Sequence, residues 1–256
     1  MDSVETKIDW DILRGQLSVA DQDRHLSTIS PLDWNEPKYF WITKNIDFTQ
    51  WVSDASSQAL WLSGPDHRGM KEVSSLIIGA AKEKAIQPNS SVLYFFCSTA
   101  TTTRGSIATV FAHTLLYQIV RSSSADKTKL IAVAFLKALL GDLSRFTESY
   151  SPSAMVEAIL NVPDKELYKP LVEAFQTAEI QELSIVIDGV DITVQEDRVF
   201  VQNVYCLVKH MMNLNSKFKA LITSPQNSDL QNMLGRLPCI EYDKERKGVH
   251  VYHSPA

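Results

Sequence analysis

Short apolar runs alternate with longer segments of helical periodicity along most of this chain, and this alternation limits the folds that it can adopt. The apolar runs have the length and composition of strands that are buried on both faces. Five such strands are expected, at residues 59–63, 92–97, 183–187, 218–223 and 239–242. Strands joined by crossover helices predict an α/β fold, with a mostly parallel sheet of about five strands and helices on both faces.

The composition divides the 256 residues into three segments. Residues 1–57 are polar and gather their aromatic side chains between positions 39 and 51, which predicts an N-terminal helical arm or linker that docks on a larger body. Residues 58–245 contain the alternating strands and helices and are expected to form the main domain. Residues 246–256 are expected to be a polar tail. Because the chain ends soon after the fifth strand, we expect it to be a fragment or a stand-alone remnant.

Charge and cysteine content exclude several classes of function. The chain has 30 acidic and 25 basic side chains, and its net charge of −5 argues against binding to nucleic acid or to an anionic membrane. No apolar run is long enough to span a membrane, and residues 1–10 carry charges where a signal peptide has an apolar core. Cys97, Cys206 and Cys239 lack metal-ligand spacing and indicate a reducing compartment. We expect a cytoplasmic protein with protein partners or self-association.

The first strand is followed by a segment that is spaced like a phosphate-binding loop. Gly64 and Gly69 match the two glycines of the pattern G-x-x-x-x-G-K-[ST], and the segment lies between an expected strand and an expected helix. Taken alone, two glycines five residues apart are explained as well by an ordinary tight turn.

Two other strand ends carry polar residues in the order that a nucleotide site requires. Asp188 and Asp191 directly follow the third strand, where an acidic motif would hold magnesium, and Ser224 ends the fourth strand, where a polar residue would contact the third phosphate. Ligands of parallel sheets bind at the carboxyl ends of the strands. An aspartate in this position is also a common turn or helix cap. The order of the three strand ends, more than any one of them, favours descent from a P-loop protein.

As a set, these landmarks resemble the NACHT domain, a STAND-class P-loop nucleoside triphosphatase, of fungal NLR-like and heterokaryon-incompatibility proteins and of related nephrocystin-3-type N-terminal domains. The resemblance covers roughly residues 20–242 and implies a role in signalling during non-self recognition and programmed cell death, where nucleotide exchange drives oligomerisation. The matching segments are Asp23-Arg24, Tyr39-Phe40-Trp41-Ile42, Asn45 to Trp51, Leu60-Trp61-Leu62-Ser63-Gly64, Tyr94-Phe95-Phe96-Cys97 with Ala100-Thr101, Leu115-Leu116-Tyr117-Gln118, Ile187-Asp188-Gly189-Val190-Asp191 and Leu221-Ile222-Thr223-Ser224.

The chain departs from the family pattern where the phosphate chemistry would take place. Met70 stands in the position of the loop lysine, Lys71 in that of the magnesium-binding hydroxyl, and His67 in that of a glycine. Pro65 removes one N–H from the donors of the loop. Two further departures, from a glutamate and an arginine of the family, are Ile192 and Pro225.

We therefore expect no catalytic residue and at most weak binding of ATP or GTP with magnesium. The chain would serve as a regulatory or scaffolding module of fungal NLR-type signalling. The positions that would contact a nucleotide are Gly64, His67, Arg68, Gly69, Met70, Lys71 and Ser224.

Two alternatives stay open. The chain could be an active ATP- or GTP-binding switch in which Lys71 replaces the lost lysine, Asp188 holds magnesium, and Asp188 and Asp191 are the catalytic residues. A shift of one residue along a helix, however, turns a side chain by about 100° and moves it by about 1.5 Å. The chain could also be a truncated gene product without a selected activity.

Overall fold

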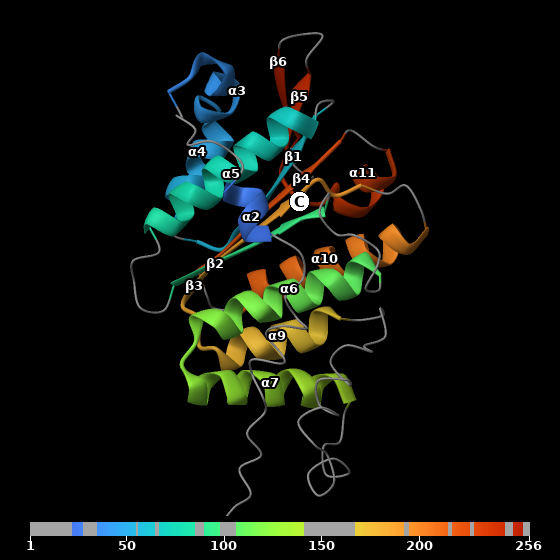
Figure 1. The fold of residues 1–256 in the computed structure, drawn as a ribbon. Helices are drawn as coiled ribbons and strands as arrows, with labels where there is room; N and C mark the ends of the chain where they lie inside the picture. Colours follow the sequence, from blue (N-terminus) through green and yellow to red (C-terminus); the bar gives the residue numbers. More distant parts are fainter. Residues whose placement is uncertain are drawn as a thin grey trace, which may run out of the picture.

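Six strands form one sheet in the order β2-β3-β4-β1-β5-β6 (Figure 1). The structure is a computed structural model that describes residues 22–27, 35–54, 56–64, 67–84, 90–97, 106–140, 167–191, 195–214, 217–225, 228–243 and 248–252. The strands are β1 (Gln58–Ser63), β2 (Ser90–Phe96), β3 (Glu182–Asp188), β4 (Lys217–Ser224), β5 (Cys239–Asp243) and β6 (Gly248–Tyr252). The first five run parallel to one another, which confirms the predicted parallel α/β sheet.

Strand β6 is an element that the sequence did not lead us to expect. It pairs antiparallel with β5, from Cys239 opposite Tyr252 to Asp243 opposite Gly248. The strand lies within the segment that we expected to be a polar tail. Five residues with two valines give too weak an alternation to predict a strand, and the pairing is stabilised because it covers the otherwise open edge of β5.

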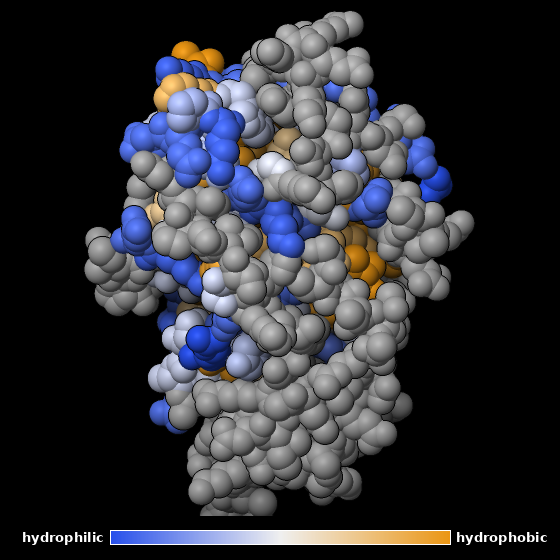
Figure 2. Space-filling model, turned by 45° about the horizontal axis from the view of Figure 1, so that its top comes forward, coloured by the Kyte–Doolittle hydropathy of each residue, from blue (hydrophilic) through white to orange (hydrophobic). Residues whose placement is uncertain are grey.

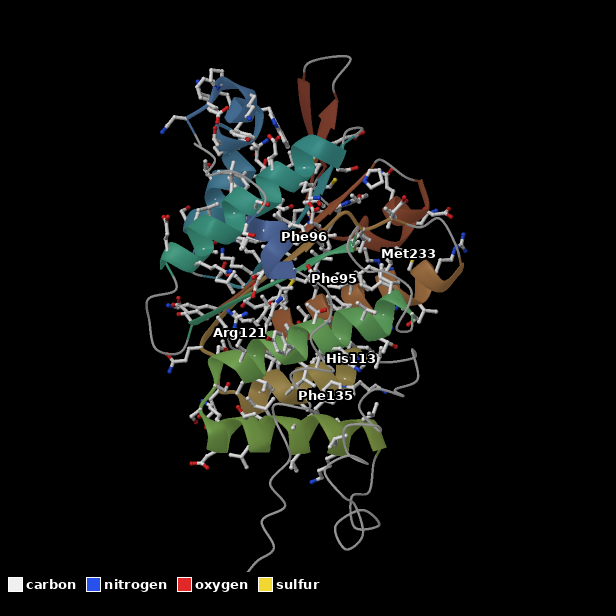
Figure 3. The ribbon with its side chains drawn as sticks, in the orientation of Figure 1. Phe95, Phe96, His113, Arg121, Phe135 and Met233 are labelled. Atoms are coloured by element: carbon white, nitrogen blue, oxygen red, sulfur yellow. The ribbon has the colours of Figure 1, made fainter. Side chains whose placement is uncertain are left out.

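The two faces of the sheet build separate apolar cores, because successive side chains of a strand point to opposite sides. Phe95 belongs to the core on one face and its neighbour Phe96 to the core on the other, as the labelled side chains in Figure 3 show. On the Phe95 face, α6 (Ile107–Ser122) and α10 (Gln195–Asn213) lie next to the sheet, with α11 (Ser228–Leu234) beside α10, and α9 (Tyr168–Thr177) and α7 (Ala125–Leu140) pack outside them (Figure 1). The Phe96 face is covered by α5 (His67–Lys84) and by the N-terminal arm.

The arm is helical, as predicted, and its aromatic residues complete the core on the Phe96 face. It consists of α2 (Gln22–Ser27), the short 3-10 helix η1 (Pro37–Tyr39), α3 (Phe40–Thr43) and α4 (Ile46–Ser53). Asn45 caps α4, because its side chain accepts hydrogen bonds from the backbone N–H groups of Asp47 (2.9 Å) and Phe48 (3.1 Å). Phe48 and Trp51 pack into the core, whereas the outer surface at the upper left of Figure 2, where the arm lies, is mainly hydrophilic.

Two glutamines cover part of the free edge of β2, the outermost strand on one side of the sheet. The side chain of Gln118 in α6 accepts from Tyr94 N at 2.9 Å and donates to Tyr94 O at 2.8 Å. Gln22 in α2 accepts from Phe96 N at 2.7 Å and donates to Phe96 O at 3.5 Å. Because an open strand edge invites pairing with other chains, these amide clamps protect the sheet and fix α2 beside β2.

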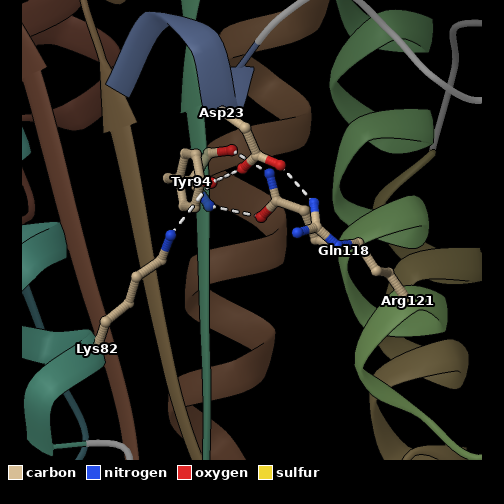
Figure 4. A network of polar contacts seen from close by, with 5 residues as sticks. All are labelled: Asp23, Lys82, Tyr94, Gln118 and Arg121. Atoms are coloured by element: carbon tan, nitrogen blue, oxygen red, sulfur yellow. Dashed lines mark hydrogen bonds and ion pairs between the residues drawn. The ribbon is translucent and has the colours of Figure 1, made fainter. Parts of the chain in front are cut away.

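A network of charged side chains joins the arm to the sheet beside these clamps (Figure 4). The Asp23 carboxylate accepts hydrogen bonds from the Tyr94 hydroxyl and from Arg121, and Lys82 Nζ donates to Tyr94 Oη at 3.2 Å. Burial by itself raises the pKa of Asp23, but the bonds from Tyr94 and Arg121 outweigh it and leave the pKa below the usual value. The ionised carboxylate therefore stabilises the docked arm.

No helix among the described residues combines the length and the apolar character that crossing a membrane requires.

We expect Phe111→Ala to lower the free energy of unfolding by about 3–5 kcal/mol, the usual cost of removing a fully buried phenylalanine. Phe111 contacts Phe95 and Phe200 with ring centroids 5.3 Å away in both cases, so its loss opens a cavity between β2, α6 and α10. Urea denaturation measures the change. The control is Leu130→Ala in α7, where the side chain is 61% exposed and the change should stay within about 0.5 kcal/mol. Equal effects of the two substitutions would contradict this account of the core.

We expect Asp23→Asn to lower the melting temperature at neutral pH and to have no effect in acid. A carboxyl whose folded-state pKa is lowered stabilises the fold above its unfolded pKa, and this contribution is lost as the pH falls through the folded pKa. Melting curves of the wild type and the variant should therefore converge as the pH falls below about 4. Glu173→Gln, at an exposed position of α9, is the control. A difference that persists unchanged in acid would show that the Asp23 charge is not involved.

Candidate functional site

The carboxyl ends of β1, β3 and β4 lie side by side, because β4 is placed between the other two strands. Ser63 is aligned with Ser224 across the β1–β4 pair, and Asp188 is aligned with Phe96 of β2. The side chains of Asp188 and Ser224 are buried. The structure thus brings together the three strand ends that the sequence analysis selected.

Asp188 is the centre of a hydrogen-bond network that joins two strands to α5. Its Oδ1 accepts from the Ser74 hydroxyl at 2.6 Å and from the Thr223 hydroxyl at 2.8 Å. Thr223 Oγ1 in turn accepts from the backbone N–H of Gly189 at 3.0 Å. Gly189 has a φ of +75°, a conformation that glycine adopts without steric cost, and it turns the chain directly after the acid. Asp188 is only 5% exposed, so this carboxylate serves as an internal acceptor.

Ser224 is likewise engaged by its own protein. Its hydroxyl accepts from Trp61 Nε1 at 2.8 Å and donates to the carbonyl of Pro225 at 2.9 Å. Its carbonyl accepts from the backbone N–H of Gly64 at 3.2 Å, which fixes the point where the chain leaves β1. The hydroxyl that would contact a third phosphate is therefore held between β1 and the segment after β4.

The segment with phosphate-loop spacing is helical over much of its length. Helix α5 begins at His67, so that Gly69 and Met70 lie in its first turn. The side chains of His67 and Arg68 lie outside the described part of the structure. Gly64 is buried and Gly69 is exposed.

Met70 and Lys71 have different environments although they are neighbours. Met70 is 4% exposed and packs in the core of the Phe96 face with Val73 and Ile77. Lys71 is half-buried, and its ammonium group forms no hydrogen bond or ion pair with any of the described residues. Since both residues are in a regular helix, the Lys71 side chain leaves the axis about 100° away from the direction of Met70.

Sequence reasoning missed Ser74 and Trp61, the two side chains that hold Asp188 and Ser224. A serine or an indole N–H forms such bonds in many surroundings, so its type alone predicts no partner. A weak signal existed, because Ser74 interrupts the apolar stripe of α5 beside Val73 and Ile77, and a polar residue on a buried stripe requires a partner.

The described residues fit a magnesium–phosphate group poorly. The apolar Met70 occupies the position of the loop lysine that would contact the phosphates. Asp188, which would hold magnesium, is bonded to two hydroxyls of its own chain. Asp191 is half-buried three residues further on. No group of three or more His, Cys, Asp or Glu side chains within the described ranges is arranged to hold a metal ion. The arrangement is well suited to holding α5 against the sheet.

We expect Ser74→Ala to destabilise the fold by about 1.5–3 kcal/mol, because it removes a hydrogen bond to a buried charged group. The neighbouring Ser75 is the matched control, since it is also buried but its hydroxyl bonds, among the described residues, only to the Lys71 carbonyl of its own helix, at 2.9 Å. Ser75→Ala should change the stability by no more than about 0.5 kcal/mol. Urea denaturation of both variants is the measurement. If Ser75→Ala lowers the stability as much as Ser74→Ala, Asp188 does not link α5 to the sheet in the way described.

A search of curated proteins gives no match to this sequence. A family model described as nephrocystin 3, N-terminal, matches residues 39–225, well over half of the chain. The matched region begins in the arm and ends at Pro225, so it includes the strand ends of β1, β3 and β4 and the Asp188 network. The chain belongs to the nephrocystin 3 N-terminal family.

Proposed function

We propose that this chain is a regulatory or scaffolding module of a signalling protein of the fungal NLR type, acting through protein partners or self-association. It binds nucleotide weakly or not at all and does not hydrolyse it efficiently. The observation that carries this proposal is the burial of Met70 in the core of the Phe96 face, where a P-loop protein places its lysine.

The size of the lost interaction supports the proposal. A charge-assisted hydrogen bond to a phosphate is worth about 1.5–3 kcal/mol, so a methionine in place of the lysine weakens binding by roughly ten- to a hundredfold. Hydrolysis requires more, because magnesium and the attacking water must also be positioned. The bonds from Ser74 and Thr223 to Asp188 give this carboxylate a structural function instead.

The composition is consistent with a protein-binding role. The net charge of −5 does not favour nucleic acid or an anionic membrane as the partner. All three cysteines are free thiols, which is in keeping with our proposal of a cytoplasmic location.

A second candidate is an ATP- or GTP-binding switch that uses Lys71 and Asp188. The observation in its favour is that the Lys71 ammonium is not held by any described residue, while β1, β3 and β4 end at the same edge of one sheet. In that case Lys71 would contact the phosphates, and Asp188 would hold magnesium through a rearranged carboxylate.

Melting curves with ATP or GTP, with and without magnesium, separate the two candidates. A ligand present at 100 times its Kd stabilises a protein by about 2.7 kcal/mol, which raises the Tm of a chain of this size by about 5–11 °C. We expect a rise of less than about 2 °C at 1 mM nucleotide, because a Kd near that concentration gives only about 0.4 kcal/mol.

The variant Lys71→Met tests the alternative directly, with Lys137→Met at an exposed position of α7 as the matched control. A large magnesium-dependent rise in Tm that is lost only in Lys71→Met, together with phosphate release, would overturn our proposal. A small rise that is the same in all three proteins would exclude the switch.

A further inference from the structure

A cavity of about 540 Å³ lies between α4, α5 and the amino-terminal half of the sheet. Its floor is formed mainly by the first residues of β2, β3 and β4, such as Val92 and Ser184, and extends to Val186 further along β3. Asp188 and Ser224 are at the opposite, carboxyl ends of these strands and do not line it. The cavity is therefore separate from the candidate site described above.

Small side chains on facing elements create the space. Ala80 and Ala81 of α5 stand opposite Ser90 of β2 and Ser184 of β3, whereas large side chains fill the rest of this face. Phe48, Trp51 and Val52 of α4 close another side. The volume lies within the range of about 300–1,000 Å³ that is typical of small-molecule sites, and the walls are mainly apolar, as such sites usually are.

The indole of Trp51 provides independent information on the kind of ligand that fits. Its ring lines the cavity, stacks on Phe48 with the centroids 6.0 Å apart, and is 7% exposed. Its Nε1 is buried and is not hydrogen-bonded to any of the described residues. A buried N–H without an acceptor is unfavourable and uncommon in folded proteins. Because Nε1 has almost no accessible surface, the indole must turn for its hydrogen to reach an acceptor in the cavity.

The charges around the cavity indicate which kind of ligand fits. Lys217 and Glu182 form an ion pair at 2.6 Å, and Lys219 Nζ donates to the Trp51 carbonyl at 2.6 Å. Together with Asp54, the lining has two cationic and two anionic side chains. Because these charges balance, the site offers no net attraction to a phosphate or another strong anion.

We propose that this cavity binds an uncharged, mainly apolar small molecule that carries a carbonyl or similar acceptor, with the acceptor directed to Trp51. The apolar part lies on Ile77, Val92 and Val186, and the acceptor satisfies the indole N–H. Such a ligand bridges α4 and α5 and thus stabilises the arm on the sheet.

Fluorescence titration with prodan, an uncharged naphthyl ketone, tests the proposal on the full chain. We expect a blue-shifted emission that saturates at one equivalent. Ala80→Leu and Ser184→Leu fill the cavity from opposite sides and should weaken the apparent Kd by at least tenfold. Trp51→Phe keeps an aromatic ring but removes the donor, so it should weaken binding by about tenfold.

Ala138→Leu is the matched control, because it makes the same substitution at a half-buried helix position in α7, away from the cavity. It should bind prodan like the wild type, and 1 mM Mg-ATP should leave the titration unchanged. The absence of saturable binding, displacement by Mg-ATP, or undiminished binding to the folded filling variants would overturn the proposal. If one filling variant does not fold, the other, from the opposite wall, decides the outcome.

Discussion

Both faces of the sheet are apolar, but the helices are divided unevenly between them, and much of the structure follows from this constraint. Among the described elements, α6 and α10 cover one face, with α11 beside α10 and with α9 and α7 packed outside them, whereas α5 and the short helices of the arm cover the other (Figure 1). A parallel sheet must be covered on both sides. The arm is therefore part of the core, which agrees with the family match beginning at residue 39. The cavity lies on the same thinly covered face.

Because few helices lie on the Phe96 face of the sheet, residues of the candidate site at the start of α5 have structural roles. The amino-terminal part of α5 packs on the sheet, and Met70 in its first turn contributes to the core together with Val73. The hydroxyl of Tyr39 donates to Glu72 at 2.8 Å, so the arm also holds the start of α5. Ser74 bonds to Asp188 from the buried side of the helix. The start of the helix is thus fixed from both sides, and residues typical of a nucleotide site serve as its anchors.

Elements with continuous local patterns could be predicted, whereas contacts made by single polar side chains could not. The run from Val92 to Phe96 is apolar on both sides of the pleat and predicts a buried strand without further information. Asp188 could be placed at the carboxyl end of a strand because it follows such an apolar run. Its bond to Ser74 joins residues 114 positions apart, and nothing in the local sequence of either residue requires it. The clamp between Gln22 and Phe96 was out of reach for the same reason. The beginning of α5 at His67 was missed because the glycine spacing suggested a loop there.

The balance of free energies at position 70 connects packing to function. Complete burial of a methionine side chain stabilises the fold by about 1.5–3 kcal/mol, and it does so whether or not a ligand is present. A lysine in the same place would supply a similar amount only when a phosphate is bound, and without phosphate it would be a partly desolvated charge beside an apolar core. With methionine at position 70, the free protein is stabilised, whereas with lysine only the nucleotide complex would be. In the scaffolding role that we propose, such a domain would keep its shape without a nucleotide, whereas a nucleotide switch must change its shape with the nucleotide.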